Sequence, residues 1–153
     1  MKILFVCLGN ICRSPTAEAV FRKKLNERGI HAHLDSAATS HFHIGHPSDP
    51  RSIDHAQRRN YEMTHLGRQV SAHDFQEFDY IFAMDDSNLK NLLQICPEKY
   101  VNKISLLTEY ARNKKYQSVP DPYYGQAADF ELVLNIIEDC AAGFIEKLSS
   151  KRP

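Results

Sequence analysis

The sequence has no excess of charge of either sign. Its 153 residues contain 19 Lys and Arg against 19 Asp and Glu, so the formal net charge is zero. Proteins that bind nucleic acid usually carry a basic surface that neutralises phosphates. The balance therefore argues against a nucleic-acid partner, although it leaves room for one local basic pocket.

Long apolar runs are also missing. No stretch approaches the roughly 20 residues that are needed to cross a bilayer. The N-terminus has one lysine and then an apolar run of strand length, without the cleavage pattern of a signal peptide. We therefore expect no membrane partner and a cytoplasmic protein, in which the four cysteines are reduced.

Metal-binding patterns are scarce as well. Cys96 and Cys140 stand far apart and neither belongs to a Cys-x-x-Cys pair, the spacing found in many zinc sites. His41, His43 and His46 cluster in one segment, but a solvated polar loop accounts for them better than a metal site does. We expect no metal and no cofactor.

What the chain does have is an alternation of short apolar runs and amphipathic segments. Strands are predicted at residues 2–7, 31–37, 79–84 and 103–107, and helices at about 15–29, 50–61, 87–95 and 129–148. Such alternation indicates a parallel sheet that is covered on both sides. Because no repeat, low-complexity tract or linker interrupts the pattern, we expect residues 1–153 to form a single α/β domain. Ligands of such sheets bind beyond the carboxyl ends of the strands.

The segment Cys7-Leu-Gly-Asn-Ile-Cys-Arg-Ser-Pro15 lies at that edge. A short loop that closes onto a helix N-terminus can turn backbone N–H groups toward a tetrahedral oxyanion. We expect Gly9 to supply an unusual backbone angle, Asn10 to bond backbone groups across the loop, and Ser14 to cap the helix. Arg13 can hold two phosphate oxygens with its planar fork.

Cys7 would lie at the bottom of this loop. The surrounding N–H groups, Arg13 and the Ser14 hydroxyl all favour the thiolate, which is the nucleophilic form. The opposing interpretation is that a cysteine ending a buried strand is a small core residue. The combination of strand, glycine, Arg-Ser and a helix opened by Pro15 favours the nucleophile.

Asp121 is the candidate proton donor. It stands between Pro120 and Pro122, which fix their own backbone angles and stiffen the segment. An aspartate beside proline is also a common turn residue, and the chemistry of the residues alone does not separate the two interpretations. Candidates for the apolar walls of a pocket around the loop are Leu8, Ile11, Phe42, Tyr123 and Tyr124.

The loop belongs to a longer pattern that resembles the low-molecular-weight protein tyrosine phosphatases. The resemblance includes the segment from Cys7 to Pro15 and three later ones, Asp35-Ser-Ala-Ala38, Met84-Asp-Asp-Ser-Asn88 and Asp121-Pro-Tyr-Tyr-Gly125. It implies a four-stranded parallel sheet in a flavodoxin-like three-layer α/β/α arrangement, with the phosphate-binding loop after the first strand. It also implies metal-independent hydrolysis of phosphotyrosine in protein substrates.

The resemblance assigns roles to individual residues. Cys7 is the nucleophile that forms a phosphocysteine, Arg13 clamps the phosphate, and Asp121 is the general acid and then the general base. Cys12 resembles a second loop cysteine that in the family can form a reversible disulfide with the nucleophile. The remaining residues of the phosphate-binding loop are Leu8, Gly9, Asn10, Ile11 and Ser14, and the supporting residues behind it are Ser36 and His65.

Several alternatives stay open. Relatives that act on phosphoarginine have a threonine in place of Ile11, so the isoleucine favours phosphotyrosine. Arsenate reductases of this fold need a further, closely spaced cysteine pair, which Cys96 and Cys140 do not supply. A phosphotyrosine-binding module without turnover would lack Cys7 or Asp121. We expect a monomer or a weak dimer.

Overall fold

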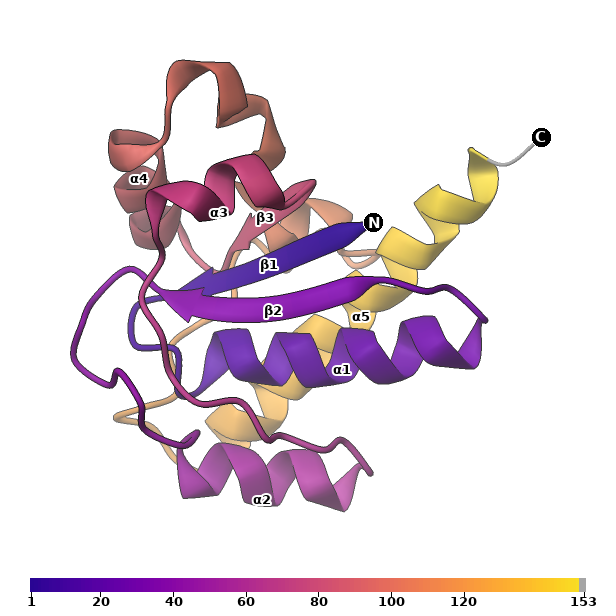
Figure 1. Ribbon diagram of the computed structural model, residues 1–153. Helices are drawn as coiled ribbons and strands as arrows, with labels where there is room; N and C mark the ends of the chain where they lie inside the picture. Colours follow the sequence, from indigo (N-terminus) through magenta and orange to yellow (C-terminus); the bar gives the residue numbers. More distant parts are fainter. Residues whose placement is uncertain (152–153) are drawn as a thin grey trace.

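A parallel sheet of four strands forms the centre of the molecule, with helices on both faces (Figure 1). The computed structural model describes residues 1–151. The sheet order is β2-β1-β3-β4. The strands are β1 (Lys2–Cys7), β2 (His33–Ala38), β3 (Tyr80–Ala83) and β4 (Ile104–Leu106). The predicted fold class is confirmed, and every predicted strand is present.

The sheet brings the carboxyl ends of three strands together at one edge. Cys7 at the end of β1 pairs in register with Ala38 at the end of β2, and Val6 pairs with Ala83 of β3. The chain then continues past this edge on all three strands. The loop after Cys7 therefore begins at the place where parallel sheets of this kind bind their ligands.

Five α-helices cover the two faces of the sheet. They are α1 (Arg13–Glu27), α2 (Pro50–Arg58), α3 (Ala72–Glu77), α4 (Asp86–Ile95) and α5 (Ala127–Ser150). Figure 1 shows α1, α2 and α5 on one side of the sheet and α3 and α4 on the other. This arrangement gives the three layers that the resemblance implied.

Alternate residues of β1 face two separate apolar cores, because successive side chains of a strand point to opposite faces. Phe5 belongs to the core under α1 and α5, where its ring lies 4.8 Å from that of Phe21. Leu4 and Val6 belong to the core under α3 and α4. Both cores therefore fix β1, and with it the start of the loop after Cys7.

The predicted ends of two helices are confirmed in atomic detail. Gly29 follows α1 with φ of +68°, and its N–H donates to the carbonyl of Asn26, as in a glycine-terminated helix. Asp49 caps α2: its carboxylate accepts from the N–H of Arg51 at 2.8 Å, and Pro50 occupies the first helical position. The N–H of Asp49 also donates to the carbonyl of Ile11 at 2.8 Å, which places the start of α2 beside the loop after Cys7.

Three short helical segments were not predicted. α3 begins with a capping box formed by Ser71 and Asp74, and two 3-10 segments cover Glu98–Lys103 and Leu107–Tyr110. Segments this short do not show a helical period in the sequence. α5 also starts before the predicted Asp129, because that residue closes the capping box at its N-terminus.

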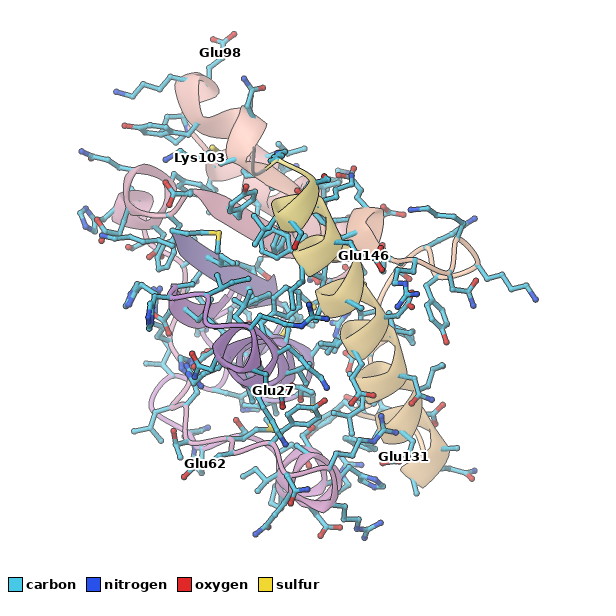
Figure 2. All side chains as sticks on the ribbon, turned by 90° about the vertical axis from the view of Figure 1, so that its right-hand side faces the viewer. Glu27, Glu62, Glu98, Lys103, Glu131 and Glu146 are labelled. Atoms are coloured by element: carbon cyan, nitrogen blue, oxygen red, sulfur yellow. The ribbon has the colours of Figure 1, made fainter. Side chains whose placement is uncertain are left out.

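Charged side chains project from the exposed faces of the helices. Glu131 and Glu146 both point outward from α5 (Figure 2), where they pair with Arg59 at 2.9 Å and with Arg112 at 3.3 Å.

Within residues 1–151, none of the helices combines the length and the apolar character that are needed to span a bilayer.

Candidate active site

The loop between β1 and α1 surrounds the sulfur of Cys7. Cys7 is 2% exposed, and its sulfur accepts from the backbone N–H groups of Asn10 at 3.3 Å and Ser14 at 3.5 Å. The Ser14 hydroxyl lies 3.0 Å from it. Three polar hydrogens are thus available to the sulfur, and each stabilises a thiolate more than a thiol.

Further N–H groups of the loop have no acceptor among residues 1–151. The residues whose N–H groups donate to no other described residue are Leu8, Gly9, Ile11 and Cys12. The first turn of α1 follows at once and adds the positive end of its dipole. Unpaired donors and a helix N-terminus together suit an oxyanion such as phosphate.

The unusual backbone angle of the loop belongs to Asn10 and not to Gly9, which corrects the sequence-based expectation. Asn10 has φ of 58°, whereas Gly9 lies outside the left-handed region. Asparagine tolerates this region better than most residues. At Gly9 a side chain would instead be crowded, since a Cβ there would lie 3.1 Å from Cδ2 of His43.

The expected cap by Ser14 is also wrong. α1 begins at Arg13 after Cys12, and no side chain caps it. The Ser14 hydroxyl instead contacts the Cys7 sulfur and accepts from Nδ2 of Asn10 at 2.8 Å. In this first turn the N–H of Ser14 donates to the Cys7 sulfur and that of Thr16 to the carbonyl of Cys12, and Pro15 has no N–H.

Asn10 connects the loop to the residues behind it. Its Nδ2 donates to the hydroxyls of Ser14 and Ser36, the latter at 3.0 Å. Its Oδ1 accepts from the N–H of Arg68 at 3.1 Å and lies 2.8 Å from Nε2 of His65. We expected bonds to backbone groups across the loop; only one partner is backbone, and the other three are side chains.

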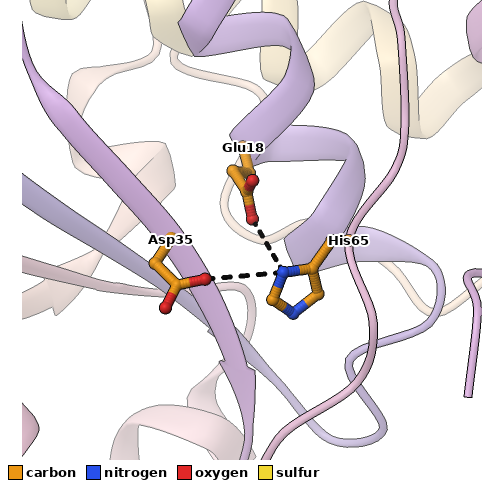
Figure 3. A group of neighbouring side chains, drawn as sticks. All are labelled: Glu18, Asp35 and His65. Atoms are coloured by element: carbon orange, nitrogen blue, oxygen red, sulfur yellow. Dashed lines mark ion pairs between the residues drawn. The ribbon is translucent and has the colours of Figure 1, made fainter. Parts of the chain in front are cut away.

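His65 also contacts two carboxylates, one on α1 and one on β2 (Figure 3). Its Nδ1 lies 3.4 Å from Oε1 of Glu18 and 3.4 Å from Oδ1 of Asp35. Among the described residues, this is the group of side chains that is close enough to hold a metal ion. However, Glu18 already accepts from Ser36 at 2.8 Å and His65 faces Asn10. The group therefore extends the hydrogen-bonded support of the loop.

The Arg13 side chain is buried beside the same sulfur. Only 3% of it is exposed, and its Nη1 donates to Oδ2 of Asp85 at 2.5 Å and to the carbonyl of Val119 at 3.0 Å. Burial alone would lower the pKa of the guanidinium, but the Cys7 thiolate and Asp85 outweigh it and raise that pKa above its usual value. Arg13 is therefore positively charged, and its guanidinium is held in place through Nη1 alone.

Asp121 also lines the cavity that Cys7 and Arg13 line. Its Oδ2 lies 3.6 Å from Nη2 of Arg13, and its Oδ1 accepts from the N–H of Tyr123 at 3.1 Å. The side chain is 44% exposed. An exposed carboxyl at the edge of a cavity can exchange protons with solvent and with a bound molecule.

These groups share one cavity of about 360 Å³. The residues that line it are Cys7, Leu8, Gly9, Ile11, Cys12, Arg13, Phe42, His43, Asp121, Tyr123 and Tyr124. Asn10, Ser14, Ser36 and His65 lie behind the loop, outside this lining. The structure thus brings every proposed catalytic and wall residue to the same opening.

Sequence reasoning missed several residues of the site. His43 was placed in a solvated loop, yet it lines the cavity against Gly9. Asp85 was not assigned as the anchor of Arg13, although it directly follows the third predicted strand at the carboxyl edge of the sheet. The Glu18 carboxylate gave no sequence signal, because one acidic residue on a helix is ordinary.

Cys12 has surroundings that differ from those of Cys7. Burial raises the pKa of the Cys12 thiol to about 12, and a hydrogen bond with the side chain of Ser52 only partly offsets this effect. Both cysteines are free thiols in the structure. The reversible disulfide between them stays a prediction.

Comparisons with known proteins agree with this geometry. The family model described as low molecular weight phosphotyrosine protein phosphatase matches residues 2–153. A relative of that name from Schizosaccharomyces pombe is 40% identical over 152 residues, which cover 97% of each chain.

Solved structures give the same result. A protein tyrosine phosphatase from Entamoeba histolytica, with Hepes in its active site, superposes with a TM-score of 0.95 at 43% identity, covering 98% of this chain and 97% of that one. A drosophila arginine phosphatase gives a TM-score of 0.93 at 34% identity, covering 99% of this chain and 100% of that one. Because the family model matches residues 2–153, this protein belongs to the low molecular weight phosphotyrosine protein phosphatase family.

Proposed function

We propose that this chain hydrolyses phosphotyrosine in proteins through a phosphocysteine intermediate. The observation that carries the proposal is that Cys7, Arg13 and Asp121 line one cavity, in which Oδ2 of Asp121 lies 3.6 Å from Nη2 of Arg13. A nucleophile, a phosphate clamp and a proton donor are the parts that transfer of a phosphoryl group requires.

In the first step, the Cys7 thiolate attacks phosphorus and the bond to the tyrosine oxygen breaks. Asp121, protonated beforehand, gives its proton to the departing oxygen, so that tyrosine leaves as a neutral phenol. Arg13 and the unpaired N–H groups of the loop hold the equatorial oxygens, where charge is concentrated during the transfer. The product of this step is the phosphocysteine and an ionised Asp121.

In the second step, water attacks the same phosphorus and the bond to sulfur breaks. Asp121, now a carboxylate, takes a proton from that water, and Cys7 leaves as a thiolate. The amide hydrogens of Asn10 and Ser14 and the Ser14 hydroxyl stabilise the departing sulfur. Inorganic phosphate is released and the cycle closes without a metal.

The walls of the cavity favour a flat aryl group. Leu8, Ile11 and Phe42 line it together with the rings of Tyr123 and Tyr124, which meet edge to face at 4.9 Å. A tyrosine ring held between these side chains would carry its phosphate down to Cys7. Since Ile11 presents an apolar side chain here, the cavity supports phosphotyrosine over phosphoarginine.

The other candidate functions have less support. Neither Cys96 nor Cys140 lines the cavity, so the relay of thiols that an arsenate reductase needs is not in place. A module that only binds phosphotyrosine has no use for Asp121 in the cavity. Both observations favour turnover.

The proposal extends to the setting of the enzyme. We propose a single domain over residues 1–153 that acts in the cytoplasm on phosphotyrosine proteins, as a monomer or a weak dimer, with no nucleic-acid or membrane partner. The balanced charge and the four free thiols are consistent with that setting.

One experiment tests the proposed activity. The purified chain is incubated in a chelator with a phosphotyrosine peptide, para-nitrophenyl phosphate and phosphoarginine, and released phosphate is measured with and without vanadate. We expect turnover of the first two that vanadate blocks, and little release from phosphoarginine. Loss of activity in the chelator, or preference for phosphoarginine, would contradict the proposal.

A further inference from the structure

The N-terminus of α2 contacts both loops of the proposed active site. The N–H of Asp49 donates to the carbonyl of Ile11 at 2.8 Å, which ties α2 to the phosphate-binding loop. The Asp49 carboxylate, only 8% exposed, accepts from Nε of Arg51 at 3.1 Å and from Nη2 at 2.9 Å. The guanidinium of Arg51 is thus held in one orientation by two bonds to a buried anion.

Arg51 then reaches the segment that carries Asp121. Its Nη2 also donates to the carbonyl of Tyr123 at 3.1 Å. The guanidinium lies 5.5 Å from the ring centre of Tyr123 and 4.7 Å from that of Phe130 on α5, within the range of cation–π contact. A lysine could not make these contacts together, because they need the planar fork.

Tyr123 is in turn the residue that holds Asp121. Its N–H donates to Oδ1 of Asp121 at 3.1 Å. Among the described residues, the other polar contact of this carboxyl is Arg13, at the longer distance of 3.6 Å. Arg51 holds the carbonyl of Tyr123 and the N–H of Tyr123 holds Asp121, so the backbone of Tyr123 connects the two side chains.

We propose that Arg51 is a positioning residue for proton transfer, which acts through Tyr123 on Asp121 and ties the acid to the phosphate-binding loop. Asp49, Arg51 and Tyr123, here called the acid strap, link two loops that are far apart in the sequence. The inference rests on the proposed function, because it assumes that Asp121 is the general acid. A misplacement of about 1 Å can reduce a rate by ~10²-fold, so a strap of this kind has a measurable effect.

The kinetic test uses two aryl phosphates that differ in the leaving group. Phenyl phosphate needs a proton on its departing oxygen, whereas para-nitrophenyl phosphate leaves well without one. For Arg51→Ala we expect kcat/KM to fall about 10-fold for phenyl phosphate and less than ~3-fold for para-nitrophenyl phosphate. Arg51→Lys should fall between Arg51→Ala and wild type. Arg58→Ala is the matched control, since Arg58 is an exposed arginine of the same helix that pairs with Asp54.

The same substitution made in an enzyme that already lacks the acid shows whether Arg51 acts through Asp121. In Asp121→Ala, the further change Arg51→Ala should alter kcat/KM of neither substrate by more than about 2-fold, because the group that it positions is gone. Equal losses on the two substrates, or the same loss in both backgrounds, would overturn the proposal and leave Arg51 as a packing residue.

Hydrogen exchange requires no turnover, so it tests the acid strap independently of the proposed function. Hydrogen exchange of the segment 119–125 should be faster in Arg51→Ala than in wild type or Arg58→Ala. Unchanged exchange would overturn the strap even if the enzyme is active. If the wild type turned over neither substrate, the proposed function would fail, and exchange would still decide whether Arg51 holds this segment.

Discussion

The cavity has a buried floor and an exposed rim, and the two groups of residues differ in solvent exposure and in hydrogen bonding. The floor residues are 3% exposed or less, whereas the rim side chains are between 39% and 95% exposed. We define the floor as Cys7 and Arg13, which line the cavity, together with Asn10, Ser14 and Ser36, which support the loop from behind. We define the rim as Leu8, Phe42, Tyr123 and Tyr124.

Hydrogen bonds show the same division. Each floor residue bonds to at least one other floor residue or to a buried carboxylate or carbonyl. The rim side chains are held by ring contacts, such as that between Tyr123 and Tyr124. A floor of this kind cannot change without leaving a polar group unpaired, so we expect substitutions in the floor to act on the chemistry and substitutions in the rim to act on the choice of substrate.

The largest effect is expected from removing the floor's nucleophile. Cys7→Ser replaces a sulfur by an oxygen that remains protonated and is a far weaker nucleophile. We expect turnover of para-nitrophenyl phosphate to fall below detection, while the fold and the binding of phosphate remain, as measured by calorimetry. Retained turnover would show that the sulfur is not the attacking group.

Asp121 lies between floor and rim and should give the next largest effect. Asp121→Asn removes the proton donor but keeps a similar shape, so kcat/KM should fall by about 10²–10⁴-fold with KM little changed. The loss should be larger for phenyl phosphate, whose departing oxygen needs the proton, than for para-nitrophenyl phosphate. Equal losses on the two substrates would assign the proton to another group.

A floor residue that does not line the cavity should matter less. Ser36→Ala leaves Nδ2 of Asn10 with one partner fewer and removes the donor to the buried Glu18. We expect a loss of about 1–3 kcal/mol in the free energy of unfolding and a moderate fall in kcat. Ser149→Ala, at an exposed position of α5, is the control for denaturant unfolding. Equal stability of the two variants would mean that the network behind Asn10 does not hold the floor.

The smallest effect is expected at the rim. Phe42→Ala removes an exposed wall, so kcat/KM for a phosphotyrosine peptide should fall by about 3–10-fold, while para-nitrophenyl phosphate should change by less than ~2-fold. Ile44→Ala is the matched control, because Ile44 is also exposed but does not line the cavity. A larger loss on the small substrate than on the peptide would place Phe42 in the floor.

The floor could largely be predicted from the sequence, because all of its residues except Ser36 lie in one short segment. A strand, a loop and a helix N-terminus follow one another within the segment from Cys7 to Pro15, and their spacing alone limits the geometry. What failed there was local detail: Asn10 has the left-handed backbone that Gly9 was expected to supply, and Ser14 bonds the sulfur instead of capping α1. In both cases contacts with other side chains outweighed the intrinsic conformational preference of the residue.

Contacts between distant segments could not be predicted in the same way. The anchor of Arg13 by Asp85 and the contact of Arg51 with Tyr123 each join residues 72 apart in sequence. Nothing in a single sequence pairs such residues. The short α3 was missed because it has too few residues to show a helical period.

The central claim is that the Cys7 sulfur takes the phosphoryl group, and mass spectrometry of the quenched enzyme tests it most directly. Wild type and Cys7→Ser are mixed with excess para-nitrophenyl phosphate, quenched in neutral denaturant within the first turnover, digested and analysed. The account predicts one added phosphoryl group on the wild-type peptide that contains Cys7, and none on the variant. Steady turnover with the phosphoryl group on another residue, or on none, would contradict it.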